Sequence, residues 1–101
     1  MDFYTKMKQN RDSILSNEEF SDMPMAYHDD LLTIPKQLLL MGFANNDELP
    51  RTFQLELTYP WKPEELKKIF EEVMNIEVET IKKNKDFPLF LCNSFIVRLK
   101  K

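Results

Sequence analysis

The sequence predicts an α+β fold, in which N-terminal helices pack on a small, mainly antiparallel sheet in the order helix-helix-β-α-β-β. Two patterns lead to this prediction. Residues 51–59 alternate between apolar and polar side chains, which is typical of a strand with one buried face. Residues 63–75 carry apolar side chains at helical spacing after a proline that suits a first helical turn. The chain of 101 residues is expected to form a single domain, mainly helical over 1–48 and β-α-β-β over 51–101.

The start of the chain is expected to form an amphipathic helix over 2–15, because its apolar residues fall near one stripe. Ser16 and Glu19 fit a capping box, in which the serine hydroxyl accepts the N–H of the glutamate. This box predicts a short helical turn that Pro24 ends, because a proline disrupts the interior of a helix. The residues over 21–28 are then expected to be irregular.

A second apolar stretch follows Asp29, whose carboxylate suits a helix start. Pro35 is unfavourable inside a helix, so two alternatives remain open. In the favoured one, a separate helical piece spans 34–41, with Pro35 in its first turn and Gly42 as its C-terminal stop. In the other, a single kinked helix spans 29–41.

The C-terminal part is expected to add two strands. Residues 76–82 either alternate as a strand or continue the preceding helix poorly, and the strand is favoured. A turn is expected at 84–86. Residues 89–99 then predict one strand, with a bulge at Asn93 and Ser94 as an option.

The composition excludes several classes of chemistry. Gly42 is the only glycine, so the glycine-rich loops that wrap nucleotide phosphates cannot be formed. His28 and Cys92 are the only histidine and the only cysteine, whereas a zinc site normally collects several such ligands. Cys92 is expected to be a buried, inert thiol. We therefore expect no enzyme activity, no cofactor and no metal.

Charge and targeting signals bear on partners and location. The net charge of −3 disfavours nucleic acid as a partner, because such binders usually carry a basic surplus. No signal peptide is visible, and no stretch approaches the ~20 apolar residues of a membrane span. A single cysteine is atypical of a small secreted domain. We expect a cytoplasmic protein that does not bind membranes.

Candidate functional residues concentrate in 18–30. The sequence His28-Asp29-Asp30 is interpreted as a helix start with two stabilising carboxylates rather than as a metal or acid–base site. An acidic stretch forms either a docking face for a basic partner or a solvated face, and it consists of Glu18, Glu19, Asp22, Asp29 and Asp30. The methionines and aromatics of the same segment, Phe20, Met23, Met25 and Tyr27, form either an interface centre or a roof over the core. Trp61 either plugs the end of the sheet or presents a rigid anchor. In each of these pairs the structural alternative is favoured, namely the solvated face, the roof over the core and the plug. The predicted partner-binding residues are Glu18, Glu19, Phe20, Asp22, Met23, Met25, Tyr27 and Trp61.

The leading functional hypothesis is a non-enzymatic protein-interaction module, an inhibitor or adaptor of a larger cytoplasmic protein. Small accessory proteins of this kind are frequent in bacteria and their phages. A second hypothesis is a small nucleic-acid-binding regulator with a degenerate helix-turn-helix, although no basic recognition helix is visible. A third is a structural homo-oligomer joined through the edge of the 89–99 strand. The partner's identity and the oligomeric state are left open.

Overall fold

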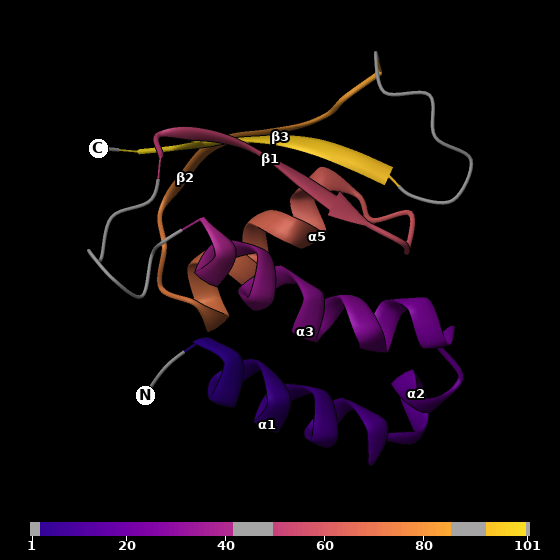
Figure 1. Ribbon diagram of the computed structural model, residues 1–101. Coiled ribbons are helices and arrows are strands. Elements are labelled where there is room, and N and C mark those ends of the chain that lie inside the picture. Colours follow the sequence, from indigo (N-terminus) through magenta and orange to yellow (C-terminus); the bar gives the residue numbers. More distant parts are fainter. Residues whose placement is uncertain (1–2, 42–49, 86–92, 101) are drawn as a thin grey trace.

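The fold is α+β, and the predicted order of helices and strands is confirmed (Figure 1). The computed structural model describes residues 3–41, 50–85 and 93–100. The elements are α1 (Phe3–Leu15), α2 (Glu18–Ser21), α3 (Met25–Leu40), β1 (Thr52–Leu57), α5 (Pro63–Lys68), the π-helical turn η1 (Ile69–Val73), β2 (Val78–Lys83) and β3 (Asn93–Leu99).

The three strands form one antiparallel sheet in the order β1-β3-β2, so the last strand lies in the middle. Phe53 lies opposite Val97 and Leu55 opposite Phe95, which places these four side chains on one face of the sheet. The alternation predicted over 51–59 is confirmed, because every second residue of β1 is buried and the residues between are exposed.

The central position of β3 contradicts the oligomer hypothesis in its original form. A homo-oligomer joined through the edge of the 89–99 strand requires that strand to have a free edge. In the structure, β3 pairs with β1 on one side and with β2 on the other. The free edges of the sheet belong to β1 and β2 instead.

The described helices cover one face of the sheet, and none of them lies on the opposite face (Figure 1). α5 and α3 lie beneath the sheet, and α1 packs along α3 on its far side. A single hydrophobic core joins these layers. Its buried members are Met7, Leu31, Ile34, Leu38, Phe53, Leu55, Leu57, Trp61, Leu66, Phe70, Met74, Val78, Ile81, Phe95, Val97 and Leu99.

α3 contradicts two expectations about the N-terminal half. It is one continuous helix with Pro35 in its interior, so the segment 21–28 is largely helical and no separate piece begins at 34. Pro24 stands immediately before the first residue of α3, where a missing N–H costs nothing. An interior proline costs a helix about 3 kcal/mol. Burial of Pro35 and its neighbour Ile34 in the core offsets that cost.

The capping box at Ser16 does not form as expected. α2 begins at Glu18, one residue later than a cap at Ser16 requires. The Ser16 hydroxyl instead donates to the carbonyl oxygen of Ser13 at 2.8 Å, so it closes the end of α1. The side chain of Glu19, the other half of the box, lies outside the described residues.

The helix predicted over 63–75 begins as expected. Pro63 is its first residue, and the Glu65 carboxylate accepts the Lys62 N–H at 2.8 Å. The second half differs, because the helix widens into η1, in which the Met74 N–H bonds the Ile69 carbonyl at 3.1 Å. This wider turn ends at Val73, two residues before Asn75.

Asn75 reverses the chain after η1 in a left-handed conformation, with φ of 58°. The following N–H, of Ile76, bonds the Phe70 carbonyl at 2.8 Å and closes the end of the helix. Asparagine and glycine tolerate this conformation, whereas most side chains do not. The chain then enters β2 directly.

The strand alternative for 76–82 is confirmed, since β2 forms there. The sheet has an irregularity between Val78 and Thr80, whereas residues 93–94 pair with β1 in unbroken register. The bulge expected at 93–94 is therefore absent from β3 and lies in β2. Residues 89–92 of the expected last strand, and with them the only cysteine, lie outside the described residues.

Exchange of Asn75 tests this helix end. We expect Asn75→Ala to lower the free energy of unfolding by about 1 kcal/mol, because its Cβ disfavours positive φ without the local polar contacts of asparagine. Asn75→Gly is expected to leave it unchanged or raise it, since glycine has no Cβ. Urea unfolding followed by Trp61 fluorescence measures both. A glycine variant less stable than the alanine variant would contradict this assignment.

Candidate functional site

Asp30 is a buried carboxylate at the junction between α3 and the end of β1. The residue is only 1% exposed, and no ion pair among the described residues includes it. Its Oδ2 atom accepts the Tyr59 N–H at 2.7 Å and the Trp61 Nε1–H at 2.8 Å. Both carboxylate oxygens accept the Thr58 N–H at 3.1 Å. These N–H donors replace the water that a buried charge loses, which is how the core tolerates it.

A tight turn at Pro60 aims the donors at this carboxylate. The Trp61 N–H bonds the Tyr59 carbonyl at 2.8 Å, across Pro60, which is the pattern of a γ-turn. The proline fixes its own φ and has no N–H to satisfy in the turn. The N–H of Tyr59 and the indole of Trp61 therefore face the same side, toward α3.

Three aromatic rings pack against one another around this junction. Tyr27 of α3 stacks on Trp61, with ring centroids 4.7 Å apart and planes 27° from parallel. Tyr59 meets both rings edge to face, with centroids 5.2 Å from each. Such pairs contribute about 0.5–1.5 kcal/mol beyond their buried area. The cluster therefore locks α3 to the segment after β1.

The interpretation of His28-Asp29-Asp30 as a helix start is wrong. α3 begins at Met25, so these residues lie beyond its first turn. Asp29 is exposed, whereas Asp30 points into the protein. The sequence signal for Asp30 was its place beside Leu31 on the buried stripe of α3, since an aspartate on an apolar stripe predicts a buried acceptor.

His28 is buried beside the aromatic cluster. It is 4% exposed, and its ring meets the Tyr27 ring edge to face at 5.5 Å. Neither ring nitrogen has a hydrogen-bond partner among the described residues.

The structure separates the predicted partner-binding residues into two groups. Trp61 occupies the plug position, because it is only 4% exposed, and Tyr27 packs partly buried against it. Met25 lies on the surface with 72% of its area exposed. The side chains of Glu19 and Phe20 lie outside the described residues.

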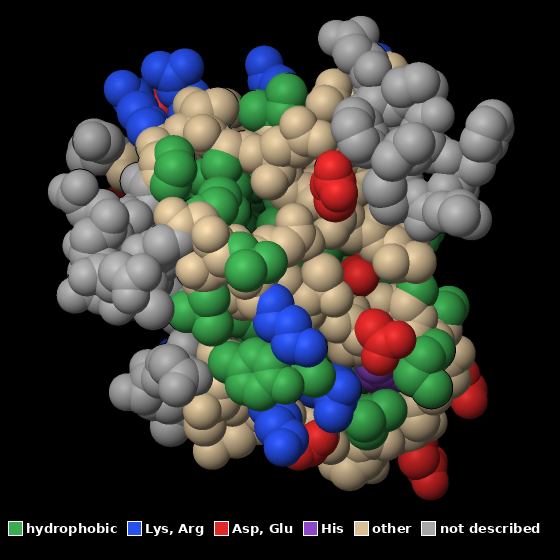
Figure 2. Space-filling view, viewed as in Figure 1, with side chains coloured by type: hydrophobic (Ala, Val, Ile, Leu, Met, Phe, Trp, Pro, Cys, Tyr) green, Lys and Arg blue, Asp and Glu red, His purple; other side chains and the backbone are tan. Residues whose placement is uncertain are grey.

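We name one region of the surface, which carries several of these residues, the acidic surface. It consists of α2 and the first turns of α3, and Figure 2 shows red carboxylates at the lower right, over these elements. Met25 and Asp29 are one helical turn apart and share a face of α3. The described side chains of the acidic surface are Glu18, Asp22, Met23, Met25 and Asp29.

Within residues 3–41, 50–85 and 93–100, no three histidine, cysteine, aspartate or glutamate side chains are grouped so that they could bind a metal ion. Nor does any helix there combine the length and the apolar character that a membrane crossing requires.

Removing the charge of Asp30 is expected to destabilise the fold strongly. Asp30→Asn turns one acceptor into an N–H₂ group that faces other N–H donors, so we expect a loss of about 2–4 kcal/mol in the free energy of unfolding. The matched control Asp29→Asn removes an exposed carboxylate from the same helix and is expected to change it by less than about 0.5 kcal/mol. Urea unfolding measures both, and equal losses would contradict the role of Asp30.

Tyr27 is expected to make stability fall at alkaline pH. Burial, followed by the charge of Glu65 and the neighbouring Tyr59, raises the pKa of the Tyr27 hydroxyl above its ordinary value. The stability that the neutral hydroxyl contributes is fully present below the pKa of an unfolded tyrosine, about 10, and is lost as pH rises through the raised folded value. Tyr27→Phe should therefore gain stability relative to the unaltered protein above about pH 10. Denaturant unfolding at several pH values tests this, and a pH-independent difference would refute it.

Comparison with protein-family models, with curated proteins and with solved structures finds no match for this chain.

Proposed function

We propose that this protein is a non-enzymatic protein-interaction module that docks through its acidic surface onto a basic surface of a larger protein. In this proposal it acts as an inhibitor or adaptor in the cytoplasm and carries no cofactor. The partner is another protein rather than a nucleic acid or a membrane.

The exposure of Met25 on a rigid support carries the proposal. Met25 is the second most exposed large hydrophobic residue among those described, at 72%. Tyr27 and Asp30, in the first two turns of the same helix, are fixed to the segment after β1 by ring contacts and hydrogen bonds. A side chain presented on a fixed backbone loses less entropy on binding. Methionine also adapts well to a partner's contours.

The charges around Met25 favour a basic partner. Glu18, Asp22 and Asp29 are all exposed, and no ion pair among the described residues includes any of them. Unpaired carboxylates around an apolar centre steer a cationic surface toward it and fix its orientation. This arrangement matches the usual anatomy of an interface, with an apolar centre and a polar rim.

The nucleic-acid alternative receives less support from the geometry. In a helix-turn-helix, the helix after the turn carries the residues that enter the major groove. Here that helix is α3, whose only basic residue is Lys36 and whose inner face is buried in the core. The exposed carboxylates of Glu18, Asp22 and Asp29, before and near the start of this helix, would repel the phosphate backbone.

Capture on the immobilised protein tests the proposal, with variants that map the contact. We expect a protein captured from the native cell extract to lose about tenfold or more in affinity with Met25→Lys or Asp22→Lys. Two controls introduce a lysine away from the acidic surface. Leu40→Lys replaces an equally exposed apolar residue at the other end of α3, and Glu72→Lys reverses an exposed charge on η1.

The controls are expected to retain the captured protein. Calorimetric titration of the identified partner at two salt concentrations should show weaker binding at the higher one, because salt screens exposed charges. The proposal is wrong if no protein is captured in several conditions, or if all four variants retain it equally.

A further inference from the structure

The two outer strands of the sheet, β1 and β2, differ in how other residues hydrogen-bond to their outer edges. α3 runs beside the end of β1 and closes the edge there, at Glu56. The Gln37 amide donates to the Glu56 carbonyl at 2.6 Å and accepts the Glu56 N–H at 3.1 Å. Asp30, two helical turns earlier on the same face, accepts the Thr58 N–H beyond the strand end. Side chains therefore occupy the C-terminal end of the β1 edge, at Glu56 and Thr58.

The edge of β2 is closed only at its beginning. The Glu71 carboxylate accepts the Val78 N–H at 3.2 Å, and the register irregularity follows directly after it. Further along, the Asn84 N–H bonds the Ser94 carbonyl at 2.8 Å. Antiparallel pairing alternates along a strand, so residues 80, 82 and 84 face β3 while residues 81 and 83 face outward.

The outward N–H and C=O groups of Ile81 and Lys83 define what we name the open edge. No described residue forms a hydrogen bond with them. Two residues with outward groups are the template that an added strand uses. The open edge is thus short, and it begins where the closure by Glu71 ends.

A groove runs alongside the open edge, between β2 and α5. It has a volume of about 320 Å³. Pro63 of α5 and Ile81 of β2 give it an apolar floor, and Lys67 lies on its α5 side. A strand added to β2 would direct every second side chain toward this groove and the others toward the open face of the sheet.

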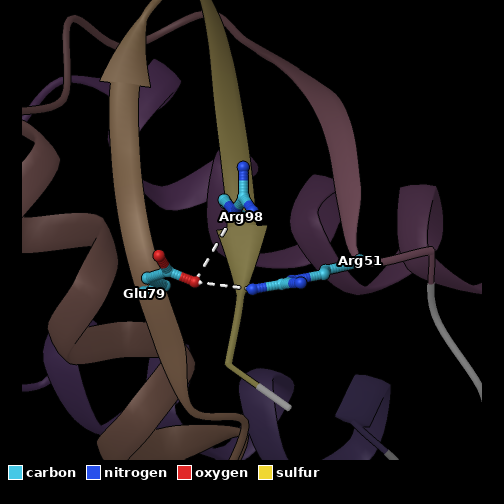
Figure 3. Close-up of polar contacts among 3 residues, drawn as sticks. All are labelled: Arg51, Glu79 and Arg98. Carbon is cyan, nitrogen blue, oxygen red and sulfur yellow. Dashed lines mark hydrogen bonds and ion pairs between the residues drawn. The ribbon is translucent and has the colours of Figure 1, made fainter.

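The charges along the open edge are mostly positive, although the exposed carboxylate of Glu64 also lines the groove. Lys67, Lys82, Lys83 and Lys85 are exposed, and none forms an ion pair with another described residue. Glu79 is already matched, because its Oε2 lies 3.1 Å from the Arg51 guanidinium and 3.5 Å from that of Arg98 (Figure 3). The lysines without ion-pair partners near the open edge therefore favour an acidic ligand.

We propose that the open edge of β2 binds an extended acidic segment of another protein as a fourth strand of the sheet. Backbone hydrogen bonds to Ile81 and Lys83 hold the segment, its apolar residues enter the groove, and its carboxylates meet the lysines. A second copy of this chain does not fit, because pairing Ile81 with the second Lys83 sets Lys82 against Lys82. The open edge is distinct from the acidic surface, so this inference does not rest on the proposed function.

Synthetic peptides test strand addition on the whole protein. The probe alternates valine and aspartate over about six residues, a typical strand length. One control alternates valine and lysine, and a second carries N-methyl groups that remove the pairing N–H donors of the valine-aspartate peptide. In an NMR titration, we expect the aspartate peptide to shift the amide signals of Ile81 and Lys83. Neither control peptide is expected to do so.

Charge reversal on the protein supplies the second measurement. The double variant Lys82→Glu with Lys83→Glu is expected to weaken binding of the aspartate peptide by about tenfold or more. The matched double variant Lys6→Glu with Lys8→Glu makes the same charge change on exposed residues of α1 and is expected to leave binding unchanged. Thermal melting verifies that both double variants fold. If the Lys82→Glu with Lys83→Glu variant does not fold, the comparison of the three peptides on the unaltered protein decides whether the open edge binds an acidic strand.

Several outcomes would overturn the inference. These are absence of binding at millimolar peptide, shifts that map away from the open edge, and equal binding of either control peptide. An equal loss of peptide affinity in both double variants would show that only the net charge of the protein matters. Amide protection at Ile81 that grows with protein concentration in the absence of peptide would assign the edge to a second copy instead.

Discussion

The burial of one carboxylate holds the two halves of this chain together. Asp30 stands on α3, and its donors Thr58, Tyr59 and Trp61 follow β1 in the sequence. A buried charge is stable only while its donors stay in place, so each half fixes the other. The hydrophobic core supplies most of the driving force, yet apolar contacts alone do not select one register of α3 along β1. The hydrogen bonds to Asp30 and the second contact at Gln37 select it.

That register determines which surfaces remain for partners. Because Asp30 and Gln37 face β1, the opposite side of α3 presents Met25 and Asp29 to solvent. The same two contacts close the C-terminal end of the β1 edge, and the strand order β1-β3-β2 leaves β2 as the other edge. A short strand with a register irregularity and several lysines is protected against unselective pairing. The same lysines favour one class of segment, which is acidic, so protection and selectivity have a common physical origin.

Much of the fold could be predicted from periodicity, because burial on one face imposes a period that the sequence records. The strand at 51–59 and the start of the helix at 63–75 are examples. Pro35 misled the prediction, because local propensity carries no information on the core contacts that offset its cost. The donors to Asp30 could not be predicted either, since they lie on a segment distant in sequence. The central place of β3 was not predictable either, because two hairpin partners of equal pattern leave strand order undetermined.

The net charge of −3 conceals a separation of charge on the folded protein. Carboxylates without partners among the described residues gather on α2 and the start of α3, and lysines without such partners gather along β2. In the two proposals, the two regions recognise their partners by different means. The acidic surface offers only side chains, so the shape and charge of a folded partner decide its affinity. The open edge offers backbone groups, which any extended chain can satisfy, so the side-chain alternation and charge of the segment must provide selectivity. A chain that engages a folded surface and an extended segment through separate regions has the layout of an adaptor. An inhibitor that only blocks a site needs the acidic surface alone.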